Sequence, residues 1–249
     1  MRRVPPLDFE PRADPVPDRI LVVTAHPDDV DFGAAGSVAV WTEAGAHVTY
    51  CVVTNGDAGG FDPTVDRSLI PGIRQAEQRA AAAEVGVKDL VFLGYPDGQV
   101  EATLGLRRDI ARVIREVRPQ RVLAPSPERM WDRLFASHPD HLAVGEAAVC
   151  AVYPDARNPF TFPELAAAGL EAWSVEELWV MATPDANVFV DMTGAFERKL
   201  AALRAHVSQE TDRGGQLADR LRGWLGANAA AAGWPEGRLA EAFRRIPTV

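Results

Sequence analysis

Residues 19–54, RILVVTAHPDDVDFGAAGSVAVWTEAGAHVTYCVVT, contain the pattern that decides the fold. Arg19–Ala25 is a short apolar run, partly β-branched, of the kind that forms a buried parallel strand. Small and apolar residues over Asp31–Gly45 predict a helix that ends at a glycine. His47–Thr54 has the pattern of a second buried strand. The stretch therefore predicts a right-handed βαβ unit.

Strands and helices continue to alternate along the rest of the chain. Further strands are expected at 89–93, 121–124, 177–182 and 188–190, and further helices at 74–85, 104–117, 138–152, 196–207 and 216–230, with a short helix in the tail from Trp234. The alternation predicts an α/β fold with an open, mostly parallel sheet and helices on both faces. Residues 1–18, which hold five prolines and mixed charge, are expected to form an extended N-terminal arm before a single domain at 19–249.

The composition narrows the classes of function. The chain has 249 residues, and its 26 Lys and Arg against 35 Asp and Glu give a formal net charge of -9. No basic run stands out, so no nucleic-acid partner is expected. The start lacks the apolar segment of a signal peptide and no apolar run could span a bilayer, so no membrane partner is expected either. Two cysteines are too few for a disulfide framework, which makes a cytoplasmic location the default expectation.

The tripeptide His-Pro-Asp occurs twice, and it is the main chemical signal in the chain. His26–Asp29 is HPDD and His138–His141 is HPDH, and together they hold three of the five histidines. Each copy follows a predicted strand and leads into a predicted helix. In open α/β sheets, ligands bind at the carboxyl ends of the strands, where the strand order reverses. The two copies are therefore expected to meet at one edge of the sheet.

Imidazole and carboxylate groups are common ligands of divalent metals. The spacing of His26 and Asp29 lets both side chains point at one ion, and we choose His141 as the third ligand. Three protein ligands leave a position open, as in catalytic zinc sites, where bound water has a pKa of about 7. Asp28, beside the ligands but not one of them, is then the expected general base.

A second signal lies at the end of the second predicted strand. Thr54–Asp57 is TNGD and opens a long loop rich in Gly, Asp and Pro. Long loops at the ligand-binding edge are functional candidates, so Asn55 and Asp57 are expected to take part in substrate binding. His206 ends a predicted helix, where a histidine complements the helix dipole, and we expect it to be structural or exposed rather than a ligand.

In this order, the motifs resemble those of the PIG-L/LmbE-like family of zinc-dependent N-deacetylases. The resemblance runs from about Arg19 to Gln209. It is carried by AHPDD at 25–29, TNGD at 54–57, Arg74-x-x-Glu77, HPDH at 138–141 and HVSQ at 206–209. The family fold is Rossmann-like, in agreement with the pattern of strands and helices.

The resemblance implies one zinc ion per chain, with the same three ligands and the same base. It also implies that His138 stabilises the oxyanion or acts as a general acid, that Asp140 orients or tunes His138, and that Arg74 contacts the substrate. The usual substrates of the family contain N-acetylglucosamine. The chain is therefore expected to be a hydrolase that removes the acetyl group from a small acetamido sugar.

Several alternatives stay open on the sequence. A related branch of enzymes cleaves larger amides from thiol–sugar conjugates. Two histidines and one carboxylate also describe a non-heme iron(II) oxygenase site. A non-catalytic nucleotide-binding protein is a further alternative, although residues 25–36, AHPDDVDFGAAG, do not give the GxGxxG phosphate turn. The oligomeric state, including a homo-oligomer, is open as well.

Overall fold

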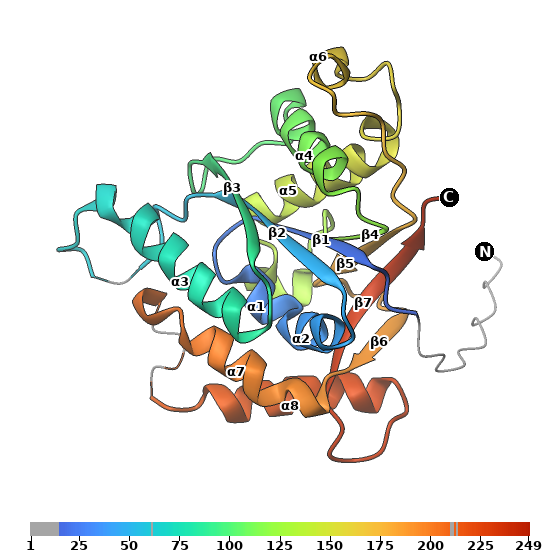
Figure 1. The fold of residues 1–249 in the computed structure, drawn as a ribbon. Coiled ribbons are helices and arrows are strands. Elements are labelled where there is room, and N and C mark those ends of the chain that lie inside the picture. Colours follow the sequence, from blue (N-terminus) through green and yellow to red (C-terminus); the bar gives the residue numbers. More distant parts are fainter. Residues whose placement is uncertain (1–14, 61, 210–211, 213) are drawn as a thin grey trace.

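The computed structural model describes residues 15–60, 62–209, 212 and 214–249, and it contains one seven-stranded sheet (Figure 1). The strands are β1 Arg19–Thr24, β2 His47–Thr54, β3 Asp89–Tyr95, β4 Arg121–Pro125, β5 Glu177–Met181, β6 Val188–Asp191 and β7 Ala240–Pro247. Their order across the sheet is β3-β2-β1-β4-β5-β7-β6. The chain thus builds outward from β1 in both directions, and the strand order reverses between β1 and β4.

Most of the sheet is parallel. The five strands from β3 to β5 pair in parallel, and only β7 runs antiparallel to its two neighbours. In the centre, Ile20 of β1 is paired with Val48 on one side and with Arg121 on the other. The central strands are buried on both faces, which explains their continuous apolar runs. The prediction of a mostly parallel α/β sheet is confirmed.

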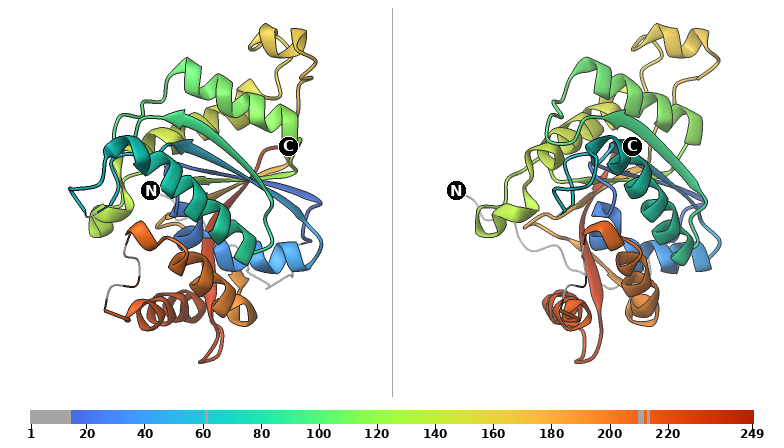
Figure 2. Two further views of the ribbon diagram at one scale, coloured as in Figure 1. Left: turned by 60° about the vertical axis from the view of Figure 1, so that its left-hand side comes forward. Right: turned by 90° about the vertical axis from the view of Figure 1, so that its left-hand side faces the viewer.

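Helices cover both faces of the sheet, as predicted (Figure 2). The helices are α1 Asp29–Gly33, α2 Ala35–Glu43, α3 Ile70–Glu84, α4 Leu104–Val117, α5 Pro139–Cys150, α6 Pro163–Ala167, α7 Phe196–Arg204 and α8 Leu217–Ala231. One apolar core joins one face of the sheet to α2, α3, α7 and α8. A second core joins the other face to α4 and α5.

The predicted helix over 31–45 is divided into α1 and α2. The backbone of Ala34 leaves the helical region between them, with φ of -146°. The carboxylate of Glu241, from β7, accepts hydrogen bonds from the backbone N–H groups of Gly36 and Ser37 at 3.0 and 2.6 Å. These are among the N–H groups that a new helix leaves without a partner in its own first turn, so β7 caps α2.

The tail from Trp234 leads through a turn into a strand, and the expectation of a short helix there is wrong. Ala240–Pro247 forms β7, which lies between β5 and β6. Phe243 at its centre is fully buried, with its ring centroid 5.4 Å from that of Trp179 in β5. The partners of this strand precede it by about 50 residues or more, so the local pattern of the tail does not reveal them.

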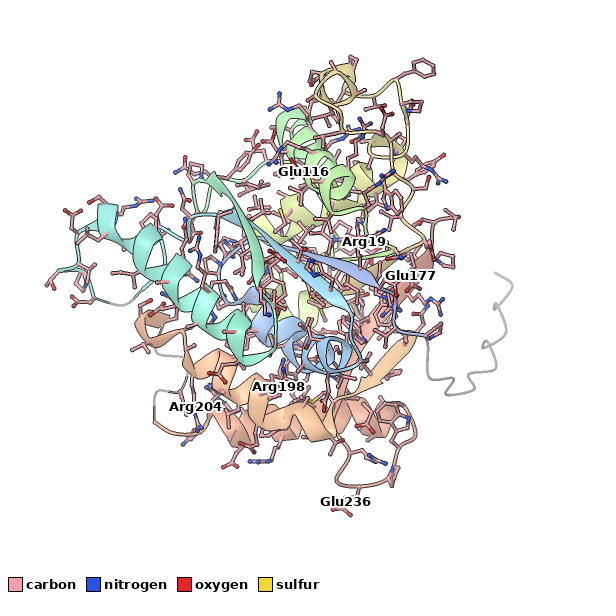
Figure 3. The ribbon with its side chains drawn as sticks, viewed as in Figure 1. Arg19, Glu116, Glu177, Arg198, Arg204 and Glu236 are labelled. Carbon is pink, nitrogen blue, oxygen red and sulfur yellow. The ribbon has the colours of Figure 1, made fainter. Side chains whose placement is uncertain are left out.

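The helix α7 is joined to α2 and α3 by hydrogen bonds from Arg198. Arg198 donates to the backbone oxygen of Glu84 at the end of α3, at 3.0 Å, and to that of Ala39 in α2, at 3.2 Å (Figure 3). The chain that follows α7 is thereby held beside α3.

Two predictions concern the chain outside the core. Residues 1–14 of the expected N-terminal arm lie outside the described residues, and residues 15–18 lead directly into β1. Within the described part of the chain, no helix has the length and apolar character required to cross a membrane.

Candidate metal centre and active site

The two His-Pro-Asp motifs meet where the strand order reverses. His26–Asp29 follows β1, and His138–His141 begins α5 after β4. Because β1 and β4 are neighbouring parallel strands, their carboxyl ends lie side by side. Donor atoms of His26, Asp29 and His141 all lie within 4.8 Å of one another. The structure therefore brings together the three residues that the sequence singles out as metal ligands.

The spacing of these donor atoms fits a single ion. His141 Nε2 lies 2.9 Å from Asp29 Oδ1 and 3.2 Å from His26 Nδ1. The distance between His26 Nδ1 and Asp29 Oδ2 is 3.5 Å. Two ligand atoms that are each about 2 Å from a tetrahedral zinc ion are separated by about 3.3 Å. The Asp29 carboxylate is oriented by the backbone, because Oδ2 accepts the N–H group of His26 at 2.8 Å.

The charges around the site favour a cation. On its other side, His26 Nε2 lies 3.1 Å from Asp140 Oδ2 and 3.2 Å from Asp97 Oδ1. Burial lowers the pKa of His26, but Asp29, Asp140 and Asp97 outweigh burial and raise that pKa to about 12. The same negative charges would stabilise a divalent ion. With Nε2 held by carboxylates, Nδ1 of His26 is directed to the other two donors, as in many metal sites.

Asp140 contacts both His26 and His138. The sequence resemblance implies that Asp140 orients or tunes His138, and that role stays a prediction. In the structure, its carboxylate contacts His26 and accepts the backbone N–H groups of Gly98 at 2.7 Å and Val100 at 3.2 Å. The contact with His138 comes from the backbone N–H of Asp140, which donates to His138 Nδ1 at 3.2 Å.

The ring of His138 lies beside the candidate metal ligands, and its Nε2 has no hydrogen-bond partner among the residues that the structure describes. Its ring centroid lies 4.8 Å from that of His26. Burial and the neighbouring His26 lower the pKa of His138, which favours the neutral ring. Because Nδ1 accepts a hydrogen bond from Asp140, the proton of the neutral ring is on Nε2. His138 can therefore donate a hydrogen bond from Nε2.

Asp28 carries a half-buried carboxyl group next to the candidate ligands. Its N–H donates to Gln78 Oε1 at 2.8 Å, and its Oδ2 accepts from Arg74 Nη2 at 3.0 Å. Burial and the adjacent Asp29 carboxylate raise the pKa of Asp28 to about 7, against the lowering effect of Arg74. A carboxyl that titrates near neutral pH is suited to transferring a proton.

Arg74, a predicted substrate contact, is enclosed by the protein. Its side chain is 4% exposed, and it donates to the backbone oxygens of Pro27 and Gly56 as well as to Asp28. A Cβ atom at Gly56 would lie 2.6 Å from Arg74 Nη1, and one at Gly59 would lie 2.4 Å from it. Glycine at both positions thus leaves room for the guanidinium group. Contact with substrate by Arg74 stays a prediction.

The other two predicted substrate contacts also have partners within the protein. Asn55 Nδ2 donates to a backbone oxygen of β3 at 3.1 Å, and Asp57 Oδ1 accepts the N–H of Asp97 at 2.9 Å. Sequence reasoning missed Asp97, whose carboxylate contacts His26. The sequence YPDG at 95–98 could have indicated Asp97, because it places an aspartate in a turn at the carboxyl end of β3. Substrate binding by Asn55 and Asp57 stays a prediction.

The fold and the site together describe a candidate metallohydrolase: an α/β sheet with a candidate metal centre at the reversal of strand order and a half-buried carboxyl group beside it. The chain belongs to the PIG-L family, because the model of that family, GlcNAc-PI de-N-acetylase, matches residues 21–152. The predicted resemblance to this family and the expectation of an N-deacetylase are confirmed.

The most informative relatives are named deacetylases. Diacetylchitobiose deacetylase from Thermococcus kodakarensis is 33% identical over 191 residues, which cover 77% of this chain and 70% of the relative. A probable N-acetyl-alpha-D-glucosaminyl L-malate deacetylase 2 from Bacillus cereus is 35% identical over 197 residues, which cover 76% and 83%. The solved structure of N,N'-diacetylchitobiose deacetylase from Pyrococcus horikoshii is similar with a TM-score of 0.82 at 28% identity, covering 93% of this chain and 85% of that chain.

Proposed function

We propose that the chain is a zinc-dependent hydrolase that removes the acetyl group from a small molecule of the N-acetylglucosamine type. One observation carries this proposal: donor atoms of His26, Asp29 and His141 converge at the junction of β1 and β4, next to the half-buried Asp28. The relatives support the substrate class, since their names refer to diacetylchitobiose and to a glucosaminyl malate.

The residues of the chain have distinct roles in this reaction. A zinc ion held by His26, Asp29 and His141 would supply a Lewis acid that polarises the amide carbonyl and lowers the pKa of water. Asp28 accepts the proton of the attacking water and returns it to the leaving amine, so that acetate and the free amino sugar are released. Neutral His138 donates a hydrogen bond from Nε2 to the oxyanion.

The direct test is an assay of primary-amine release over a panel of N-acetylated sugars. We expect release with zinc present, loss of release after chelation, and recovery when zinc is returned. Release only from larger thiol–sugar amides would favour a conjugate amidase. Oxygen consumption with iron(II) would favour an oxygenase, and tight nucleotide binding without hydrolysis would favour a binding protein.

The role of Asp28 is tested by Asp28→Asn. Loss of a general base lowers kcat by roughly 10²- to 10⁴-fold, while the three candidate ligands are unchanged. We therefore expect one zinc per chain and a strongly reduced rate of amine release. Full activity in this variant would remove Asp28 from the mechanism.

The role of His141 is tested by metal analysis. His141→Ala removes one of three candidate ligands, and we expect the purified variant to lose its zinc. His47→Ala is the matched control, because the His47 side chain is 59% exposed and lies at the opposite end of the sheet. Equal zinc content in the two variants would contradict the proposed ligand set.

A further inference from the structure

A hydrogen-bonded series of buried polar side chains leads away from the backbone of Asp28. Gln78, Asp31 and His206 are each fully buried. Gln78 Oε1 accepts the N–H of Asp28, Gln78 Nε2 donates to Asp31 Oδ2, and His206 Nε2 contacts the same oxygen, each at 2.8 Å. Burying polar groups costs free energy unless they are paired, so the presence of this buried polar series requires an explanation.

These hydrogen bonds fix the orientation of the side-chain amide of Gln78. The side-chain amide of glutamine has a donor end and an acceptor end. Because a carboxylate only accepts, the nitrogen of Gln78 must face Asp31. The oxygen of Gln78 then faces the N–H of Asp28, which it accepts. The contact of His206 with Asp31 holds the carboxylate in this position. The hydrogen bond between Gln78 and Asp28 thus depends on the side chains of Asp31 and His206.

The backbone of Asp28 needs this support. Its φ is 96° and its ψ is -27°, a conformation that residues other than glycine rarely adopt. Such conformations persist only when the surrounding structure determines them. On the other side of the same peptide, Arg74 donates to the Pro27 oxygen and to the Asp28 carboxylate. Arg74 and Gln78 are one turn apart on the same face of α3. Both form hydrogen bonds to the peptide group between Pro27 and Asp28.

The segment that carries His206 is anchored to the same helix. The backbone N–H and the Oγ of Ser208 donate to the two carboxylate oxygens of Glu77, both at 2.7 Å. Figures 1 and 2 show α7, which ends just before His206, lying beside α3. The late HVSQ motif and the Arg74-x-x-Glu77 motif therefore belong to one assembly around Asp28.

We propose that Gln78, Asp31 and His206 are positioning residues that hold the Asp28 carboxylate where it can take the proton of the attacking water. This inference rests on the proposed function, since it needs Asp28 as the base. A reacting group that is displaced by 1 Å can lose on the order of 10²-fold in rate. Variants of the three residues are therefore expected to lower kcat and to leave zinc content and KM nearly unchanged.

The first experiment compares matched variants of His206 on di-N-acetylchitobiose. His206→Leu removes the contact with Asp31, and we expect a kcat that is lower by roughly 10- to 100-fold. His206→Gln keeps an N–H donor at the distance of Nε2, so most of the rate is expected to return. Ser208→Ala is the control, because it loosens the same segment without touching Asp31. Equal kcat values in His206→Leu and Ser208→Ala, at equal zinc content, would overturn the proposal.

The second experiment is a double-mutant cycle. Gln78→Met removes both hydrogen bonds and keeps the length of the side chain. If Gln78 acts through Asp28, Gln78→Met lowers kcat in the natural chain and has little further effect on the residual rate of Asp28→Asn. A purely structural role would lower both rates by the same factor and would overturn the inference.

The cycle also separates the two proposals. A low rate in Asp28→Asn with a normal rate in Gln78→Met would overturn the positioning role alone. A normal rate in Asp28→Asn would overturn the base assignment and the positioning role with it. If Gln78→Met fails to fold, the His206 pair decides the question.

Discussion

The two ring nitrogens of His26 face different environments. Nδ1 lies among the candidate ligands, and Nε2 lies against the carboxylates of Asp140 and Asp97. A carboxylate that contacts the ring nitrogen not bound to the metal fixes the tautomer and the ring orientation of a metal-binding histidine. The backbone N–H groups that Asp140 accepts hold its carboxylate in place. The orientation of His26 in the candidate metal site therefore depends on Asp140.

Asp140→Asn is expected to weaken zinc binding without abolishing it. Loss of such a partner typically costs roughly 10- to 100-fold in metal affinity. Competition with a chromophoric chelator measures the change. Asp109→Asn is the control, because Asp109 pairs with Tyr95 away from the candidate ligands. An unchanged zinc affinity in Asp140→Asn would contradict the role inferred for this carboxylate.

The position of α5 depends on a glycine in its interior. A Cβ atom at Gly145 would lie 2.5 Å from the backbone oxygen of Pro125 and 2.8 Å from the backbone nitrogen of Pro127. The helix therefore approaches the end of β4 more closely than any other residue would allow. His141 is one turn before Gly145 on α5, so this close approach also places a candidate ligand.

Gly145→Ala is expected to push α5 away from β4. Overpacking of this kind costs about 1–3 kcal/mol in the free energy of unfolding, and the displaced His141 should lower zinc affinity. Gly226→Ala in α8 is the matched control, since a Cβ there would meet no described atom within 4 Å. That change should stabilise the protein by about 1 kcal/mol through helix propensity. Thermal unfolding and zinc titration of both variants check these outcomes.

Across the whole molecule, a buried ion pair joins parts of the chain that are distant in sequence. Lys199 Nζ on α7 lies 2.7 Å from Glu241 Oε1 on β7, and both side chains are fully buried. Lys199 also donates to the backbone oxygen of Asp31 at 2.8 Å, and Glu241 accepts the N–H of Ser37. The pair therefore links α7, α1, α2 and the last strand of the sheet.

Lys199→Met is expected to destabilise the fold strongly. Removing one partner of a buried pair leaves the other charge uncompensated, which costs about 3–5 kcal/mol. Arg112→Gln is the control, because Arg112 and Glu116 form an exposed pair within α4 whose loss should cost about 0.5 kcal/mol or less. Denaturant unfolding of the two variants gives the comparison. Similar free energies of unfolding would contradict the importance of the buried pair.

The sequence predicts local features of this molecule better than its distant pairings. His26, Asp29 and His141 could be singled out because residue type and the rule on strand ends suffice to place them. His206 was expected to be structural or exposed from its place at a helix end. Its contact with Asp31 spans 175 residues and depends on how α7 packs, which no local pattern encodes. The same reason explains why β7 was missed, since its partners are distant in sequence.

The insertion of β7 between β5 and β6 has a consequence for biosynthesis. A nascent chain emerges from the ribosome with its N-terminal part first. β6 is therefore translated before the strand that joins it to the sheet. All three candidate zinc ligands have been translated once residue 141 is made. The hydrogen bonds that support Asp28 are complete only after His206 has been translated. The candidate metal ligands can come together on the growing polypeptide while the far margin of the sheet is still unfinished.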